Sequence, residues 1–340
     1  PAPGGKWVSP RAGVAAAYEL VAKTHPESMF VIDCDLAPST KVDLAQKVLD
    51  SDHQFQLSIE EQIATMLANG LAVSTPTPKL VVFATFAAFF EGIAREGFEM
   101  WRYQRNLTGA NEGLNVTFHL SHVGSCTGRD HFSGWSLDWI NLAIGYLPYL
   151  DRFYAPADAR AAFVAIADLA SRNGAHIIGI PRDNLPVLTQ QDSTAPLWNA
   201  DSPWTDATQL RAMPGARKAI LAFGATAFVA AEAADKLGAD GMAVDAWVIN
   251  GLPLDENRLE QLFTQYPEGI VTIEDGLIGT PEKGIRGFAG LVRGAAYDRK
   301  IPLIHLGITD PRIAPSEGHL ELWQYFGLDV PTAIAAVKAL

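Results

Sequence analysis

A glutamate at the start of a small, apolar, helix-like stretch is the residue of this sequence best suited to proton chemistry. The stretch runs from residue 58 to 72, and Glu61 falls in its first predicted turn. Ser58 is a suitable N-cap, and Asn69-Gly70 is a suitable C-terminal end. A carboxyl group at the mouth of so apolar a helix lies where proteins tune general acids and bases. The open alternative is a solvated glutamate that interacts only with the helix dipole.

Acidic and hydroxyl side chains follow the first predicted strand. Asp35, Leu36 and Ser39 come shortly after the apolar residues 29–32. Open parallel sheets bind ligands off the carboxyl ends of their strands, so this segment is a candidate binding loop. Taken alone, Asp35-Leu36 is more typical of a helix cap or a turn.

Aromatic side chains recur at Phe86, Phe89 and Phe90, three and four residues apart. This spacing is typical of the buried face of a helix. The same rings would offer faces on which a flat heterocycle can stack. The pattern alone does not decide between the two.

Three histidines lie close together in the sequence, at His119, His122 and His131. Their spacing fits no common zinc pattern, and Cys34 and Cys126 are too far apart in sequence to complete one. We therefore expect no metal ligand in this chain.

The elements that must position these residues alternate between short apolar strands and helices. Strands are predicted at 29–32, 80–83, 116–120, 176–180, 218–223, 242–249, 270–273 and 302–306, and helices at 13–23, 59–71, 86–103, 157–171, 227–237, 255–265 and 330–340. This alternation is typical of parallel sheets covered on both faces. We predict an α/β protein of two doubly wound domains, residues 1–188 and 216–340, joined by a polar, proline-containing linker at 189–215.

The composition limits the partners. The chain has 340 residues, of which 48% are hydrophobic, and this is enough for two domains with their own cores. Its net charge of −12 argues against nucleic acid or an anionic membrane as partner. Two cysteines make no disulfide framework, and no signal or transit peptide is recognisable, so we expect a cytoplasmic protein.

The stretch around Glu61 resembles the helix that carries the cofactor-activating glutamate in the transketolase family and related thiamine-diphosphate enzymes. Glu61 falls on that glutamate, and residues 69–72 match the family's Asn-Gly-Leu-Ala without a gap. Glu60 and Gln62 replace its Arg and His. The resemblance implies that the chain has the family's pyrimidine-binding domain followed by its C-terminal domain.

The resemblance also implies how the chain would hold thiamine diphosphate. Glu61 would hydrogen-bond the pyrimidine ring of the cofactor. Asp35 and Leu36 match a pair that lines the cofactor pocket, and Phe86 and Phe89 match the aromatic residues that bind the ring.

A second set of matches implies a sugar phosphate as substrate. Arg11, Ser39, His122 and Arg182 match the family's phosphate-binding positions. Arginine suits phosphate because its planar fork donates paired hydrogen bonds and keeps its charge.

Two residues of the loop at 128–135 complete the implied site. Asp130 matches a contact to the sugar hydroxyls, and His131 would stand in for a family histidine that is missing there. The resemblance assigns catalysis to Glu61, together with His122.

The chain lacks the Gly-Asp-Gly motif through which this family holds the diphosphate and Mg²⁺. Asp275-Gly276 lacks both the first glycine and the later asparagine. We therefore expect a partner subunit that carries the motif and the Mg²⁺, in a two-fold heterotetramer.

The resemblance implies the C-terminal subunit of a split transketolase, which moves a two-carbon ketol unit between sugar phosphates. Two alternatives stay open. One is the beta subunit of a 2-oxoacid dehydrogenase, which shares the same plan. The other is a non-catalytic scaffold subunit.

Overall fold

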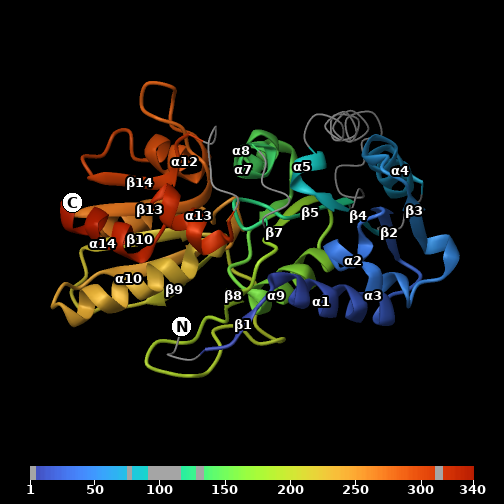
Figure 1. The fold of residues 1–340 in the computed structure, drawn as a ribbon, viewed down its shortest axis with the longest axis horizontal. Coiled ribbons are helices and arrows are strands. Elements are labelled where there is room, and N and C mark those ends of the chain that lie inside the picture. The colour runs from blue at the N-terminus through green and yellow to red at the C-terminus, as the bar shows by residue number, and fades with distance from the viewer. Residues whose placement is uncertain (1–4, 75–78, 91–115, 128–133, 311–316) are drawn as a thin grey trace.

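The computed structural model describes residues 5–74, 79–90, 116–127, 134–310 and 317–340. Within these residues two α/β units lie side by side, each built on its own sheet (Figure 1). The sheets have seven and five strands, and a two-stranded sheet joins β1 (Trp7–Val8) to β8 (Leu185–Pro186). The predicted α/β fold class is confirmed.

The larger sheet has the strand order β12-β6-β7-β5-β4-β2-β3. Its strands are β2 (Met29–Cys34), β3 (Gln54–Leu57), β4 (Leu80–Phe86), β5 (Val116–Ser121), β6 (Arg152–Tyr154), β7 (Ala175–Ile180) and β12 (Gly251–Leu252). All paired strands are parallel except β12 and β6. Every residue of the four central strands is buried, as expected where helices cover both faces.

Helices cover the two faces of this sheet. One face packs against α4 (Glu61–Val73) and α8 (Trp139–Tyr146), and the other against α1 (Pro10–Thr24), α3 (Asp43–Gln46) and α9 (Ala159–Ala170). The short helices α2 (Ala37–Thr40), α5 (Ala87–Phe89) and α7 (Gly134–Leu137) follow the carboxyl ends of strands. Helix α1 approaches α9 so closely that a Cβ on Gly13 would lie 1.7 Å from the Ala159 carbonyl oxygen.

The smaller sheet has the order β14-β13-β10-β11-β9. Its strands are β9 (Ala207–Arg211), β10 (Lys218–Phe223), β11 (Asp245–Ile249), β13 (Gly269–Leu277) and β14 (Leu303–Ile308), and β9 alone among them runs antiparallel to its neighbour. One face packs against α11 (Arg258–Gln265) and α12 (Gly287–Ala295), and the other against α10 (Ala227–Ala239), α13 (His319–Phe326) and α14 (Val330–Ala339). Strand β9 lies within the segment predicted as a linker.

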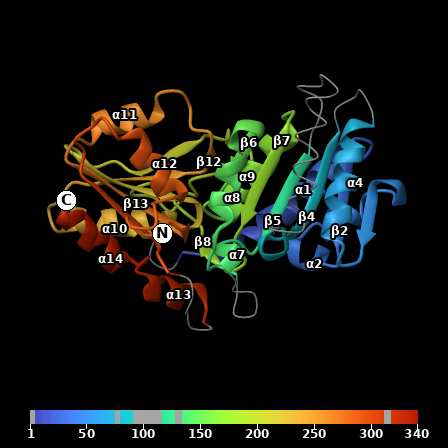
Figure 2. The ribbon, with the colours of Figure 1, turned by 90° about the horizontal axis from the view of Figure 1, so that it is seen from above.

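The two units share part of their core. The view from above shows them side by side (Figure 2). Trp139 and Phe153 of the first unit contact Phe223 of the second, with ring centroids 6.2 and 5.7 Å apart. Strand β12 comes from the sequence of the second unit but pairs with β6 in the first sheet. The units are therefore joined by packing as well as by the chain.

The boundaries of α4 differ from the prediction. Glu60 is its N-cap residue and Ser58 lies outside the helix, because the helix begins only at Glu61. The helix also continues through Asn69 and Gly70 to Val73, since its small face stays packed on the sheet. A helix was predicted at 86–103, but Phe86 is the last residue of β4 and the helix α5 begins after it. Residues 91–103 lie outside the described part of the chain.

No helix in the described part of the chain is long and apolar enough to span a membrane.

Candidate functional site

The carboxylate of Glu61 is buried at the N-terminus of α4. Its residue is only 2% exposed, although it is the first residue of its helix. The cause is the small buried face of the helix, Ala64, Ala68 and Ala72, which lets the backbone lie close against the sheet. Thr85 on β4 donates its hydroxyl hydrogen to Glu61 Oε1 over 3.3 Å. The solvated-glutamate alternative is therefore wrong.

The opposite face of α4 carries apolar side chains that are exposed. Ile59, at the approach to the helix, is 78% exposed, and Ile63 and Met66 are 54% and 45% exposed. A run of exposed large apolar side chains on one helix is typical of an interface. We call these three residues the outer face of α4.

An aromatic row lies at the carboxyl ends of β4 and β5. Phe86 is buried between Phe89 and His122, with ring centroids 5.7 and 3.9 Å away and interplanar angles of 28° and 21°. Phe89 is 39% exposed, so it is the member of the row whose ring reaches solvent. The spacing of the phenylalanines predicted either a buried core or a surface for stacking. Phe86 belongs to the core, whereas the ring of Phe89 lies at the surface.

Arg11, Ser39 and His122 come together from three separate segments. Arg11 Nη1 donates to the Ser39 carbonyl oxygen over 2.9 Å and lies 3.4 Å from His122 Nε2. His122 adopts a φ of 60° directly after β5, and this left-handed turn accompanies its stacking on Phe86. Burial, and then the charge of Arg182, lower the pKa of Arg11. An anion bound here would relieve that cost.

Arg182 belongs to the same group through Ser9. Its carbonyl oxygen accepts a hydrogen bond from Ser9 Oγ over 2.7 Å, and Arg11 Nε donates to that hydroxyl over 3.3 Å. The Arg182 backbone N–H and Nη1 donate to the carbonyl oxygens of Cys126 and Thr127. Ser9 is a site residue that was not predicted from the sequence, where its place two residues before Arg11 is its only signal. We call Arg11 and Arg182 the arginine pair.

Asp35 and Leu36 form a tight turn after β2. Asp35 has a φ of 62°, is exposed, and accepts a hydrogen bond from Gln56 on β3 over 3.0 Å. The Leu36 N–H donates to both carboxylate oxygens of Asp33, each at 3.1 Å. Asp33 is buried, which raises its pKa, and it was missed from sequence although it holds the turn.

The loop after β5 is held by a carboxylate of the second unit. Asp275 on β13 is buried and accepts hydrogen bonds from the Ser125 N–H, the Ser125 hydroxyl and the Cys126 N–H at 2.8–3.2 Å. Gly124 is required beside it, because a Cβ there would lie 2.4 Å from Asp275 Oδ2 at a φ of +68°. In the sequence, Asp275 stands out only as part of an incomplete metal motif. Its contacts show that it fixes the loop that binds Arg182.

Asp130 and His131, predicted to contact the sugar, lie outside the described residues. All the other predicted site residues are described. Arg11, Ser39, His122 and Arg182 form one connected group, which Phe86 and Phe89 join through the ring of His122. Leu36 joins it too, because its carbonyl oxygen accepts the Ser39 N–H over 2.8 Å. Glu61 contacts Thr85, and Asp35 contacts Gln56.

The sequence and the fold identify the class of protein. Residues 8–187 match the family described as the transketolase pyrimidine binding domain, and the chain belongs to this family. The predicted resemblance to transketolases is confirmed. Enzymes of the transketolase family are transferases that depend on thiamine diphosphate.

Solved structures agree over the whole chain. A split-gene transketolase, described as an inactive beta4 tetramer, has a TM-score of 0.74 at 24% identity, with 98% of both chains covered. The transketolase of Campylobacter jejuni has a TM-score of 0.72 at 17% identity, covering 99% of this chain and 47% of that one. At these identities the likeness shows the fold alone.

Curated relatives carry a different name. The 1-deoxy-D-xylulose-5-phosphate synthase of Methylibium petroleiphilum is 27% identical over 265 residues, covering 76% of this chain and 37% of the relative. That of Ralstonia nicotianae is 25% identical over 292 residues, covering 84% and 41%. The chain thus spans about two fifths of the length of these relatives.

Proposed function

We propose that this chain is the subunit of a thiamine-diphosphate-dependent transketolase that supplies the pyrimidine-activating glutamate and the phosphate-binding arginines. It would move a two-carbon ketol unit between sugar phosphates, together with a partner subunit that holds the diphosphate and Mg²⁺. The buried carboxylate of Glu61 carries this proposal, because a scaffold subunit has no use for a desolvated carboxylate at a helix end.

The residues around Glu61 fit the pyrimidine half of the cofactor. A buried carboxylate hydrogen-bonds a ring nitrogen more strongly than a solvated one does. Phe89, which is 39% exposed and lies in the helix that follows β4, offers a ring face on which a flat heterocycle could stack. The bound cofactor would supply the electron sink for breaking a carbon–carbon bond next to a carbonyl group. Glu61 would hold the proton that this activation requires.

The arginine pair fits the phosphate group of the substrate. The Ser9 hydroxyl accepts from the Arg11 guanidinium and donates to the backbone carbonyl oxygen of Arg182, so it ties the two residues together. The charge of Arg182 lowers the pKa of Arg11, and an anion bound between the two guanidinium groups would relieve this repulsion. His122, which Arg11 contacts, would orient the sugar next to the reacting carbon. We extend this proposed role to Asp130 and His131 from the family resemblance alone.

Two features support the partner subunit. The 340 residues carry no Gly-Asp-Gly motif, and the chain that matches them over 98% of both lengths is described as a split-gene transketolase in an inactive beta4 tetramer. The outer face of α4, directly behind Glu61, is the natural place for the partner. A two-fold heterotetramer would pair two copies of each chain.

The curated relatives favour one alternative reaction. Their name describes the synthesis of a sugar phosphate, 1-deoxy-D-xylulose 5-phosphate, and this product would equally suit the arginine pair. A 2-oxoacid dehydrogenase subunit would have no use for that pair, so we favour it less.

The test is to express this chain with the subunit that carries Gly-Asp-Gly and to assay the pair with thiamine diphosphate and Mg²⁺. Formation of a seven-carbon sugar phosphate from two pentose phosphates is the expected result. Formation of deoxyxylulose phosphate, or oxidation of a 2-oxoacid, would assign the chain to the respective alternative.

In the active pair, Glu61→Gln should lower the turnover number by about 100-fold or more, the usual contribution of a positioned acid or base. Glu60→Gln is the matched control, because Glu60 is exposed at the preceding position. Equal activities in the two variants would overturn the role of Glu61.

A further inference from the structure

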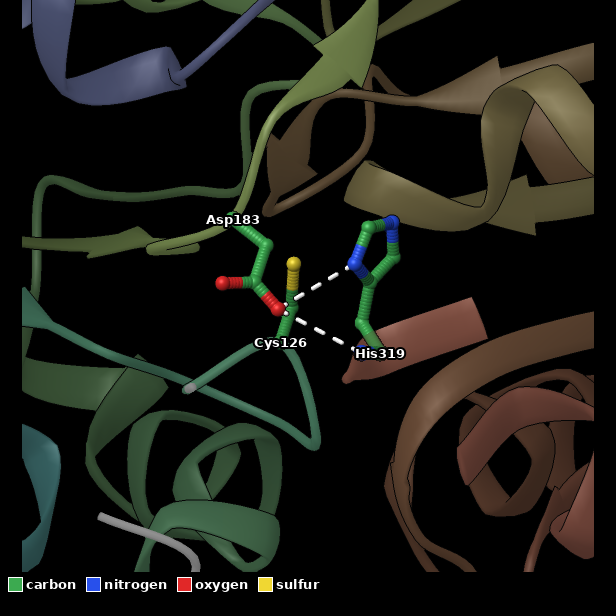
Figure 3. Close-up of side chains that lie close together, drawn as sticks. All are labelled: Cys126, Asp183 and His319. Atoms are coloured by element: carbon green, nitrogen blue, oxygen red, sulfur yellow. Dashed lines mark hydrogen bonds and ion pairs between the residues drawn. The ribbon is translucent and has the colours of Figure 1, made fainter. Parts of the chain in front are cut away.

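Three side chains that can bind a metal converge at the seam between the two units. Cys126 lies in the loop after β5, Asp183 in the loop after β7, and His319 is the first residue of α13 in the second unit (Figure 3). The sulfur, one carboxylate oxygen and one imidazole nitrogen all lie within 4.8 Å of one another. Cys126 and His319 are buried, and Asp183 is half-buried.

The imidazole turns Nδ1 toward the other two side chains. Nδ1 lies 3.1 Å from Asp183 Oδ2, and the backbone N–H of His319 donates to the same oxygen over 3.3 Å. Because Nδ1 contacts Asp183, a Cys-His-Asp catalytic triad would need the other nitrogen, Nε2, next to the sulfur. Figure 3 shows Nε2 pointing away from it. The arrangement brings three ligand atoms to one point instead.

We propose that Cys126, Asp183 and His319 bind one Zn²⁺ ion. Thiolate, carboxylate and imidazole are the side-chain ligands of zinc, and a thiolate excludes Mg²⁺ and Ca²⁺. Bonds of about 2.0–2.3 Å set tetrahedral ligand atoms about 3.3–3.8 Å apart, so small side-chain rotations complete the site. Water takes the fourth position.

The charge balance suits a buried site. A thiolate and a carboxylate together carry two negative charges, and a neutral imidazole adds none. One Zn²⁺ therefore makes the site neutral, which avoids the cost of burying a net charge.

The ion would tie together the segments that hold the proposed substrate site. The carbonyl oxygen of Cys126 accepts the backbone N–H of Arg182, and Asp183 is the next residue. His319 anchors both loops to the second unit. The ion thus has a structural role at the seam, and this inference does not depend on which reaction the enzyme catalyses.

Cobalt provides a direct test, because Co²⁺ occupies zinc sites and a cobalt–thiolate bond absorbs in the near ultraviolet. The full chain, freed of metal with a chelator, is titrated with Co²⁺. We expect one Co²⁺ per chain with a thiolate charge-transfer band, displacement by Zn²⁺, and a higher unfolding midpoint with Zn²⁺ bound.

Variants assign the ligands. Cys126→Ser should abolish the band. Asp183→Asn and His319→Gln should each weaken Co²⁺ binding at least about tenfold, because even the loss of a group that only supports a metal ligand costs about 10- to 100-fold in affinity. Cys34→Ser is the matched control, because Cys34 is the other buried thiol and lies in the first unit on β2. Circular dichroism verifies that each variant is folded.

Three results would overturn the zinc site. They are the absence of stoichiometric binding, a band that survives Cys126→Ser, and binding that Asp183→Asn and His319→Gln leave unchanged. Any of them would leave Asp183 and His319 as a hydrogen-bonded contact between the units, with Cys126 packed beside it.

Discussion

The surroundings of Glu61 and of the arginine pair lie at neighbouring strand ends but are built differently. Glu61 accepts a hydrogen bond from Thr85, and the helix behind it presents an exposed apolar face. The arginine pair is enclosed by contacts from the chain itself, through Ser9, Ser39 and the loop that Asp275 holds. The second region is preorganised by this chain, whereas the first offers a surface to another molecule.

Breaking the outer face of α4 should have the largest effect. Ile63→Asp places a charge in the proposed interface, which costs about 2–4 kcal/mol at a well-packed centre. The affinity for the partner subunit should fall about 30- to 1000-fold while the chain itself stays folded, as measured by calorimetric titration. Tyr297→Asp is the control, since Tyr297 is 88% exposed on the second unit. An unchanged affinity of Ile63→Asp for the partner subunit would show that the partner does not bind to the outer face of α4.

Breaking the arginine pair should impair substrate binding but not assembly. Arg11→Ala removes a charged hydrogen bond worth about 1.5–3 kcal/mol, so KM for the sugar phosphate should rise about 10- to 100-fold. Steady-state kinetics measures this, with Arg217→Ala as control, because Arg217 is paired with Glu268 on the surface of the second unit. An unaltered KM would mean that the pair binds no phosphate.

Weakening the support of the pair should have a smaller effect on both stability and KM. Asp275→Asn keeps the shape but removes the charge and turns a donor toward the loop, at a cost of about 1–3 kcal/mol in unfolding free energy. Denaturant unfolding and KM measure the two effects, and exposed Asp201→Asn is the control. If Asp275→Asn kept full stability, the hydrogen bonds from this residue of the second unit would not be needed to hold the loop at the substrate site.

The stability of the first unit should also fall in acid, because β5 carries the buried residue His119. Burial lowers the pKa of His119 from 6.5 to about 3. Its neutral form is bound between the Tyr18 hydroxyl and Ser121 Oγ. Between these pH values the unfolded chain binds a proton that the folded chain does not, so stability falls as pH falls below 6.5.

From pH 6.5 to 5.5 the contribution of His119 is about 1 kcal/mol. Denaturant unfolding at the two pH values should therefore show a smaller pH dependence in His119→Gln than in the native chain. His25→Gln is the control, because His25 is exposed directly after α1. An identical pH dependence in His119→Gln would show that another group is responsible.

The sequence predicted the fold well where burial is continuous. The apolar runs at β2, β4, β5 and β7 are typical of strands covered on both faces, and they are too short for buried helices. Strands of two or three residues, such as β1, β6, β8 and β12, are too short to show any period. These short strands form because a strand distant in the sequence has a free edge with which they can pair, and no local sequence pattern predicts such a pairing.

The candidate site divides in the same way. Glu61, the aromatic row and the grouping of Arg11 with His122 could be predicted because they belong to sequence motifs. Ser9 and Asp275 bind segments that lie 173 and 150 residues away in the sequence, so nothing local distinguishes them. Asp33 binds Leu36 only three residues later, but it belongs to an otherwise apolar strand whose end the sequence does not mark. The burial of Glu61 could not be predicted with the same certainty as its position. It depends on how closely α4 packs against the sheet, and the alanines of the helix indicate close packing without fixing the distance.

The short strand β12 has a consequence for how the protein can be divided. It covers the outer edge of β6, and Gly251 permits this because a Cβ there would lie 2.2 Å from the Phe153 carbonyl oxygen. A fragment ending at residue 188 would lose that cover and expose the unpaired backbone of β6. Open strand edges recruit other strands, so the first unit expressed alone should self-associate and aggregate.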